Sequence, residues 1–97
     1  MLIARVTGLV VATMKHDSLV GSKLLIVQET DVAGKSVGSP MVAVDAVDAG
    51  EGDLVLVTQG SGARQTEFTL DRPVDNIIMA IVDTLQSNGH VTFRKGR

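Results

Sequence analysis

Few residues of this sequence have the types and spacing that chemistry requires, and the first are His16 and Asp17. A carboxylate beside an imidazole can orient it for acid–base catalysis if other elements bring a substrate to the pair. The other histidine of the sequence is His90, far along the chain, so neither an HxxxH nor an HxH metal-binding motif is present. We therefore interpret His16 and Asp17 as a solvated loop pair.

The next candidates are Asp45 and Asp48, which lie three residues apart on or beside a predicted strand. Side chains on a strand alternate between its two faces, so these carboxylates do not share a face as a catalytic pair would. We assign them structural roles in a turn. The sequence contains no cysteine, which excludes disulfides and thiolate metal sites. We accordingly expect no catalytic residue, no metal and no cofactor, and hence no enzyme.

A glycine-rich loop that ends in one arginine follows an apolar segment. Its residues are Gly60, Ser61, Gly62, Ala63 and Arg64. Successive backbone amides together with a guanidinium could hold an anion. The GxxxxGK[ST] phosphate-binding signature is absent, however, and no helix directly follows. A tight turn between strands is the favoured interpretation, and a binding role for the loop stays open beside it.

Alternating stretches rich in β-branched residues predict a mainly β domain. The predicted strands are 2–13, 23–30, 41–47, 53–58, a short 66–70 and a terminal 90–95. The last of these could add to a sheet edge, including that of a neighbouring subunit. We expect the first strand to bend through a bulge at Gly8, and the all-apolar face of Val42, Val44 and Ala46 to point inward. Strand 53–58 is almost continuously apolar, which predicts burial on both of its faces.

The apolar pattern changes after Pro73. From there the large aliphatic residues recur at the spacing of one helical stripe; they are Val74, Ile77, Ile78, Ile81, Val82 and Leu85. This spacing predicts one short amphipathic helix packed on the strands. Asp75 would cap its first amides, and Ser87-Asn88-Gly89 would supply the left-handed exit at its end.

Length and composition favour an assembly. The chain of 97 residues is long enough for one domain with a limited core, so residues 1–97 are predicted to be a single domain. It is 44% hydrophobic, with two aromatic residues and a mean hydropathy of +0.26. A chain this short cannot bury so much apolar surface alone, which favours a permanent oligomer.

The charge of the chain disfavours nucleic acid as a partner. Nine Lys and Arg against eleven Asp and Glu give a net charge of -2, which provides no basic field for a phosphate backbone. The segment 1–13 has Arg5 inside it and alternates, so it does not predict a signal peptide. No stretch of about 20 apolar residues predicts a membrane span. We expect a cytoplasmic protein with no membrane partner.

Several segments follow one another in an order and spacing that are specific when taken together. They are Ala4–Gly8, Val11–Lys15, Leu19–Leu25, Ala43–Gly52, Gly60–Arg64, and Pro73–Asp75 through Ile81–Asp83. With these segments the chain resembles, over nearly its whole length, the EutN/CcmL family of bacterial microcompartment vertex proteins.

The resemblance implies a small OB-like β-barrel with one short α-helix in the C-terminal region, assembled into a cyclic homo-pentamer. Such pentamers cap the five-fold vertices of a protein shell in the cytoplasm, and hexameric shell proteins of the same microcompartment would be the partners. Because a sheet of hexagonal tiles is flat, five-fold units supply the curvature that closes it. The implied function is therefore structural.

Within such a pentamer, we expect the loop Gly60–Arg64 at a subunit seam or at the central pore. Further candidate shell or subunit contacts are Lys15, His16, Asp45 and Glu51. Two positions depart from the family pattern, since Gly62 stands where serine is usual and Asp48 where glycine is common. Asp tolerates the left-handed backbone, so the expected fold is unaffected.

Two other classes of function stay open. An OB-like module for single-stranded nucleic acid would need stacking aromatic residues and a basic groove, and two phenylalanines with a net acidic charge supply neither. A small anion-binding or enzyme subunit that uses His16, Asp17 and Arg64 would need three distant segments to converge.

Overall fold

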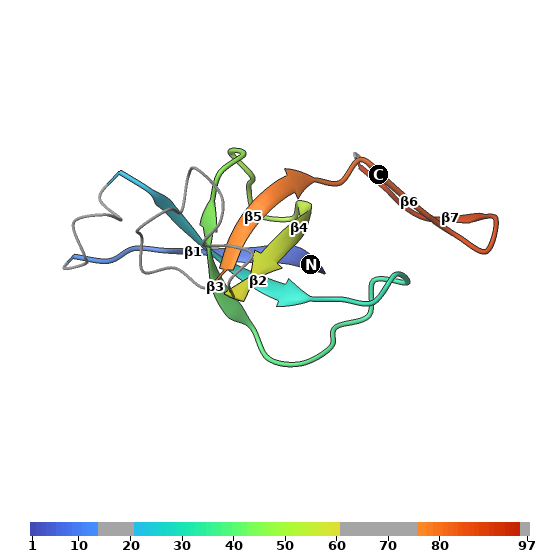
Figure 1. Cartoon of the computed structure of the whole chain (residues 1–97), viewed down its shortest axis with the longest axis horizontal. Coiled ribbons are helices and arrows are strands. Elements are labelled where there is room, and N and C mark those ends of the chain that lie inside the picture. Colours follow the sequence, from blue (N-terminus) through green and yellow to red (C-terminus); the bar gives the residue numbers. More distant parts are fainter. Residues whose placement is uncertain (14–20, 61–75, 96–97) are drawn as a thin grey trace.

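The computed structural model describes residues 1–13, 21–60 and 76–95, and seven strands lie within these ranges. They are β1 (Leu2–Val10), β2 (Lys23–Glu29), β3 (Met41–Asp45), β4 (Leu54–Gln59), β5 (Asn76–Ile81), β6 (Thr84–Ser87) and β7 (His90–Arg94). Figure 1 shows β1 to β5 gathered into one body, while β6 and β7 project from one end of it. The mainly β architecture predicted from the sequence is confirmed.

The first five strands close into a barrel in the order β1–β2–β3–β5–β4, and β4 returns to β1. Neighbouring strands are antiparallel apart from β3 and β5, which run parallel and pair at only two positions. Side-chain amides add to the pairing of β5 with its two neighbours. Asn76 Nδ2 donates to Val42 O of β3 at 3.0 Å, and Gln59 Nε2 of β4 donates to Asn76 Oδ1 at 3.0 Å. These bonds fix the start of β5 between β3 and β4.

Small and medium aliphatic side chains from all five strands fill the barrel. The core cluster comprises Ala4, Val6, Leu25, Val27, Ala43, Ala49, Val55, Val57 and Ile78. A narrow five-stranded barrel has little room between its walls, which suits valine and alanine better than aromatic rings. Burying each large aliphatic side chain stabilises the fold by about 1.5–3 kcal/mol.

Gly8 carries the bulge that the sequence predicted in the first strand. The register between β1 and β2 shifts between Val6 and Gly8, which confirms that prediction. A Cβ atom on Gly8 would lie 3.3 Å from Ile26 Cδ1. The missing side chain therefore leaves the space in which the Ile26 side chain packs over the bend.

The predicted short α-helix after Pro73 is wrong for every residue of it that the structure describes. Residues 76–81 form β5 and 84–87 form β6, and no α-helix occurs in 1–13, 21–60 or 76–95. The run NIIMAIV is short and rich in β-branched residues, and for such a run periodicity cannot distinguish a buried strand from a helix. Ile77 and Ile78 are both fully buried, as expected of a strand covered on both faces. Asp75, the predicted cap, lies outside the described residues.

Asn88 and Gly89 form the turn between β6 and β7. Their φ angles are 52° and 79°, and the ladder closes on the pair Ser87 and His90. Two central residues with positive φ are typical of the tight turn that suits the twist of a hairpin. The predicted left-handed backbone is thus present here, but it ends a strand rather than a helix. The predicted terminal strand is confirmed as β7, with β6 as its partner in the chain.

Strand β3 faces the other way from the prediction. Ala43 is buried in the core, whereas Val42 is 49% exposed and Ala46 is exposed. Asp45 shares the inward face, where an ion pair compensates its charge. Val44 is buried too, but outside the core cluster. The alternation was therefore correct, and the choice of inner face was wrong.

Strand β4 bears out the predicted burial on both faces only at its start. Leu54 and Val55 are adjacent and both buried, whereas Leu56 and Thr58, on the face of Leu54, are half-buried. The predicted strand 66–70 lies outside the described residues.

Candidate functional site

Lys23 and Asp45 lie opposite each other on β2 and β3, at one mouth of the barrel. Lys23 Nζ is 3.6 Å from Asp45 Oδ2 and 3.3 Å from Asp48 Oδ1, and it also donates to Ala49 O. The Asp45 side chain is 1% exposed, against 39% for Lys23. No described residue donates a hydrogen bond to Asp45 Oδ2, so the ammonium group is what compensates this buried charge. Asp48 reaches Lys23 from a left-handed backbone, with φ of 59°.

The turn between β3 and β4 is tied down on both sides. Gly50 N donates to Asp53 Oδ2 at 2.8 Å, and Gly52 N donates to Val6 O at 2.8 Å. Gly52 has φ of 92°, a conformation in which a side chain would be strained. These bonds fix the position of Glu51, which is exposed at the tip of the turn.

A hollow of about 250 Å³ opens at the same mouth of the barrel. We call it the mouth groove, and its lining residues are Gly8, Leu9, Lys23, Leu25, Gly50 and Glu51. Leu9 is 59% exposed although it lies on a strand. Asp45 and Asp48 both pair with Lys23 and offset its charge, so the exposed Glu51 leaves this mouth net acidic. An exposed aliphatic side chain with an acidic rim suits a protein partner that offers apolar and basic side chains.

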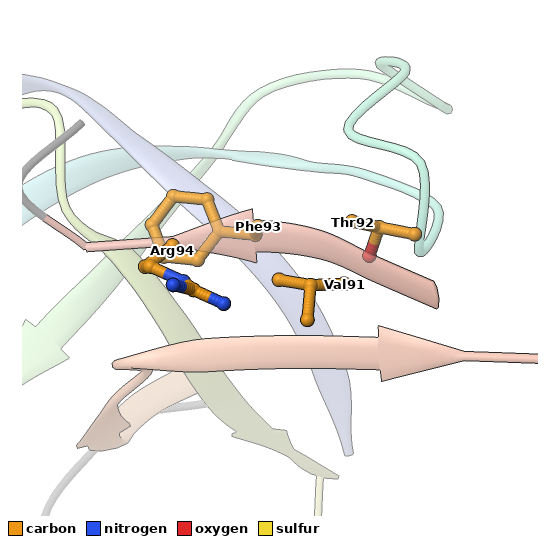
Figure 2. Close-up of a pocket in the computed structure, with 4 residues that line it drawn as sticks. All are labelled: Val91, Thr92, Phe93 and Arg94. Atoms are coloured by element: carbon orange, nitrogen blue, oxygen red, sulfur yellow. The ribbon is translucent and has the colours of Figure 1, made fainter. Parts of the chain in front are cut away.

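The β6–β7 hairpin is the second surface feature. Its two strands pair with each other and form a sheet separate from the barrel (Figure 1). Figure 2 shows the residues of β7 that line a hollow of about 310 Å³, namely Val91, Thr92, Phe93 and Arg94. Val91 is 45% exposed. Because a lone two-stranded hairpin is marginally stable in water, burial of Val91 and Phe93 against a partner would stabilise it.

The sequence-predicted site residues fall in different parts of the molecule. Gly60 directly follows β4 and has φ of 64°, and the rest of the predicted loop, 61–64, lies outside the described residues. Lys15 and His16 lie outside them too. Asp45 is buried and paired within the chain, whereas Glu51 is exposed on the rim of the mouth groove.

Within 1–13, 21–60 and 76–95, no three His, Cys, Asp or Glu residues gather as a metal site would require. His90 is exposed at the start of β7. In the same part of the chain, no helix has the length and apolar character that a membrane span needs.

Neither the Lys23–Asp45 pair nor the hairpin was predicted from the sequence. The hairpin does leave a signal, because Asn88-Gly89 between alternating residues is typical of a two-residue turn. The ion pair leaves no signal in the sequence, because its two residues are far apart in the chain and only the register of β2 on β3 brings them together.

Known proteins resemble this chain over almost all of its length. The model of the family described as "Ethanolamine utilisation protein EutN/carboxysome" matches residues 1–83, so the match ends where the hairpin begins. The bacterial microcompartment shell vertex protein EutN of Escherichia coli K12 is 42% identical over 95 residues, which cover 98% of this chain and 100% of EutN.

Solved structures agree with this similarity. The structure of Gloeobacter violaceus CcmL has a TM-score of 0.92 at 39% identity, and 100% of each chain is covered. GrpN, a pentameric microcompartment shell protein from Rhodospirillum rubrum, has a TM-score of 0.81 at 40% identity, with 90% of this chain and 99% of GrpN covered.

Proposed function

This chain belongs to the EutN/CcmL family, and we propose that it is a structural shell protein whose pentamers occupy the five-fold vertices of a bacterial microcompartment. The observation that carries the proposal is the 42% identity to a shell vertex protein across 98% of the chain. The likeness to a pentameric shell protein at 40% identity supports five as the number of copies. A free module for nucleic acid or small anions is not favoured, because the similar proteins are shell proteins.

The proposed role is geometric. Hexagonal tiles alone form a flat sheet, and replacing a six-fold unit by a five-fold unit forces the sheet to curve. A closed shell therefore needs a second kind of tile that is small, rigid and five-fold. A closed barrel with a dry aliphatic core provides a rigid subunit, since it has no free sheet edge to pair at random.

Hexameric shell proteins are the proposed partners of the ring. A pentamer offers the same outer edge five times, and each edge would meet one neighbouring tile. The proposed contacts Lys15, His16 and Glu51 are polar, as expected of a rim rather than of the dry centre of an interface. Such contacts would set which tiles fit beside the ring more than how tightly they bind.

The loop Gly60–Arg64 is proposed to lie at the subunit seam or around the ring axis. Glycine allows close approach of backbones where equivalent loops converge, and a guanidinium can bind a carboxylate or carbonyl of the next copy. Arg64→Glu should then disturb ring assembly or incorporation into shells. Normal behaviour of this variant in both assays would remove the role of the loop.

Reconstitution of the shell tests the proposed function. The chain is produced together with the hexameric shell proteins of its microcompartment, and the particles are imaged by electron microscopy. Closed polyhedral shells with this chain at their vertices are expected. When the chain is omitted, the particles should keep open vertices or grow as sheets and tubes. Equally well closed shells without the chain, or purified shells that do not contain it, would contradict the proposal.

A further inference from the structure

Two exposed apolar features lie at opposite ends of the protomer. In Figure 1 the β6–β7 hairpin projects from one end of the long axis, and the C-terminal end of β1 extends toward the other. The molecule measures 45 Å along this axis and 25 and 23 Å across it. The hairpin carries the exposed Val91, the end of β1 carries the exposed Leu9, and the exposed Val11 follows directly after β1. A hairpin so placed cannot reach the mouth groove of its own chain.

We propose that the hairpin of one copy docks into the mouth groove of the next copy around the ring. Val91 and Phe93 pack against Leu9, and Arg94 faces Glu51 across the rim. This inference rests on the proposed function, because it names the two surfaces that join neighbouring subunits of the pentamer.

The symmetry of a ring requires two such surfaces. In a cyclic assembly larger than a dimer, each subunit uses one patch toward the neighbour on one side and a different patch toward the other. A projecting element on one side and a hollow on the other, both apolar, meet this requirement. Docking would also give the hairpin the packing that a two-stranded sheet lacks alone.

Charge complementarity supports the choice of partner. The β7 end of the hairpin bears Arg94 and Lys95, both exposed, whereas the mouth groove is lined by the exposed Glu51, and the exposed Asp48 lies beside it against Lys23. Opposite charges at the rim of an interface favour the correct orientation of the two surfaces. A second copy of this chain therefore supplies both the apolar and the basic side chains that the groove suits.

Cross-linking provides the first test, because the native chain has no cysteine. The double variant Leu9→Cys/Val91→Cys is treated with a short thiol cross-linker and separated under denaturing conditions. Docking between neighbours predicts a ladder of covalent species up to five chains. The matched control Leu9→Cys/Val37→Cys moves the second thiol to the exposed loop between β2 and β3 and should give no ladder. A double variant no more cross-linked than this control would overturn the inference.

Charge reversal provides the second test. Arg94→Glu and Glu51→Arg each place like charges at the rim, and each should raise the concentration at which half of the rings dissociate by about tenfold or more. The combined variant Arg94→Glu/Glu51→Arg restores the opposite pair and should recover most of the loss. Lys35→Glu, a reversal on the exposed β2–β3 loop, should leave dissociation unchanged.

The outcomes separate this inference from the proposed function. A native chain that does not form rings would contradict the proposed function itself. Native rings that are unaffected by the single reversals, or single reversals that the combined variant fails to rescue, would overturn only the hairpin–groove contact. Intact rings whose hairpin variants fail to enter shells would also overturn it, and would assign the hairpin to the contact with hexameric tiles.

Discussion

Lys23 Nζ lies 3.6 Å from Asp45 Oδ2, across the ladder that joins β2 to β3 at one mouth of the barrel. Asp45 is the only charged residue in the buried class among the described residues, and its other oxygen accepts a hydrogen bond from Val47 N at 3.0 Å. The pair also anchors the start of the turn that presents Glu51. A single ion pair thus links the stability of the barrel to the shape of the mouth groove.

Removing the ammonium group should therefore cost stability. Lys23→Met leaves the Asp45 carboxylate buried without a cation, and we expect a loss of about 1–3 kcal/mol in the free energy of unfolding. The estimate is below that for a fully buried pair because Lys23 is 39% exposed and solvent screens the charge. Chemical denaturation at one fixed protein concentration measures this loss. Adding Asp45→Asn to Lys23→Met should recover part of it, and an unchanged stability in Lys23→Met would contradict the role of the pair.

The bulge at Gly8 gives a graded prediction. In Gly8→Ala the new methyl group would meet Ile26 Cδ1 at 3.3 Å, which Ile26 can relieve by a small shift because it is only half-buried. We expect Gly8→Ala to lower the free energy of unfolding by about 1 kcal/mol or less, and Gly8→Val to lower it more. Ile26→Val removes the Cδ1 atom, so the loss caused by Gly8→Ala should shrink in that background. If Gly8→Ala costs the same free energy of unfolding with Ile26 and with Ile26→Val, the contact with Ile26 Cδ1 is not the cause of the loss.

Strand β5 can be tested against the helix that the sequence predicted. Ile78 is in the core, whereas its neighbour Met79 is 38% exposed. Ile78→Ala should lower the free energy of unfolding by about 2–5 kcal/mol, because it leaves a cavity in the barrel. Met79→Ala should change it by about 0.5 kcal/mol or less. Comparable losses at the two positions would contradict the orientation of this strand.

The turn of the hairpin predicts different effects at its two residues. Gly89 has φ of 79°, so Gly89→Val should destabilise the hairpin by about 1–2 kcal/mol. Asn88→Gly keeps a residue that favours positive φ and should be tolerated. Amide hydrogen exchange of β6 and β7 reports the local effect. Equal protection of these amides in both variants would argue against the assigned turn.

The barrel strands were predictable because each leaves a local mark in the sequence. Alternation and β-branched residues located β1 to β4, and a glycine within an apolar strand marked the bulge at Gly8. The inner face of β3 was not predictable in this way. Its deciding feature is that Asp45 points inward, and this depends on Lys23 from another strand.

The error at β5 has a physical cause. Residues 77–82 are all apolar, and so short an apolar run is consistent with a buried strand as well as with part of a buried helix. Whether this segment forms a strand or a helix depends on the gap between β3 and β4, which β5 fills. That gap is a property of the whole barrel and leaves no local signal in the sequence. The signal at Asn88-Gly89 was local, but it was interpreted as a helix exit because the preceding segment had already been assigned to a helix.

Native mass spectrometry of the unmodified chain at micromolar concentration is the most direct test of the proposed pentamer. We expect one dominant species with five times the mass of a single chain. A stable monomer, or a ring with any other number of copies, would contradict a role at five-fold vertices.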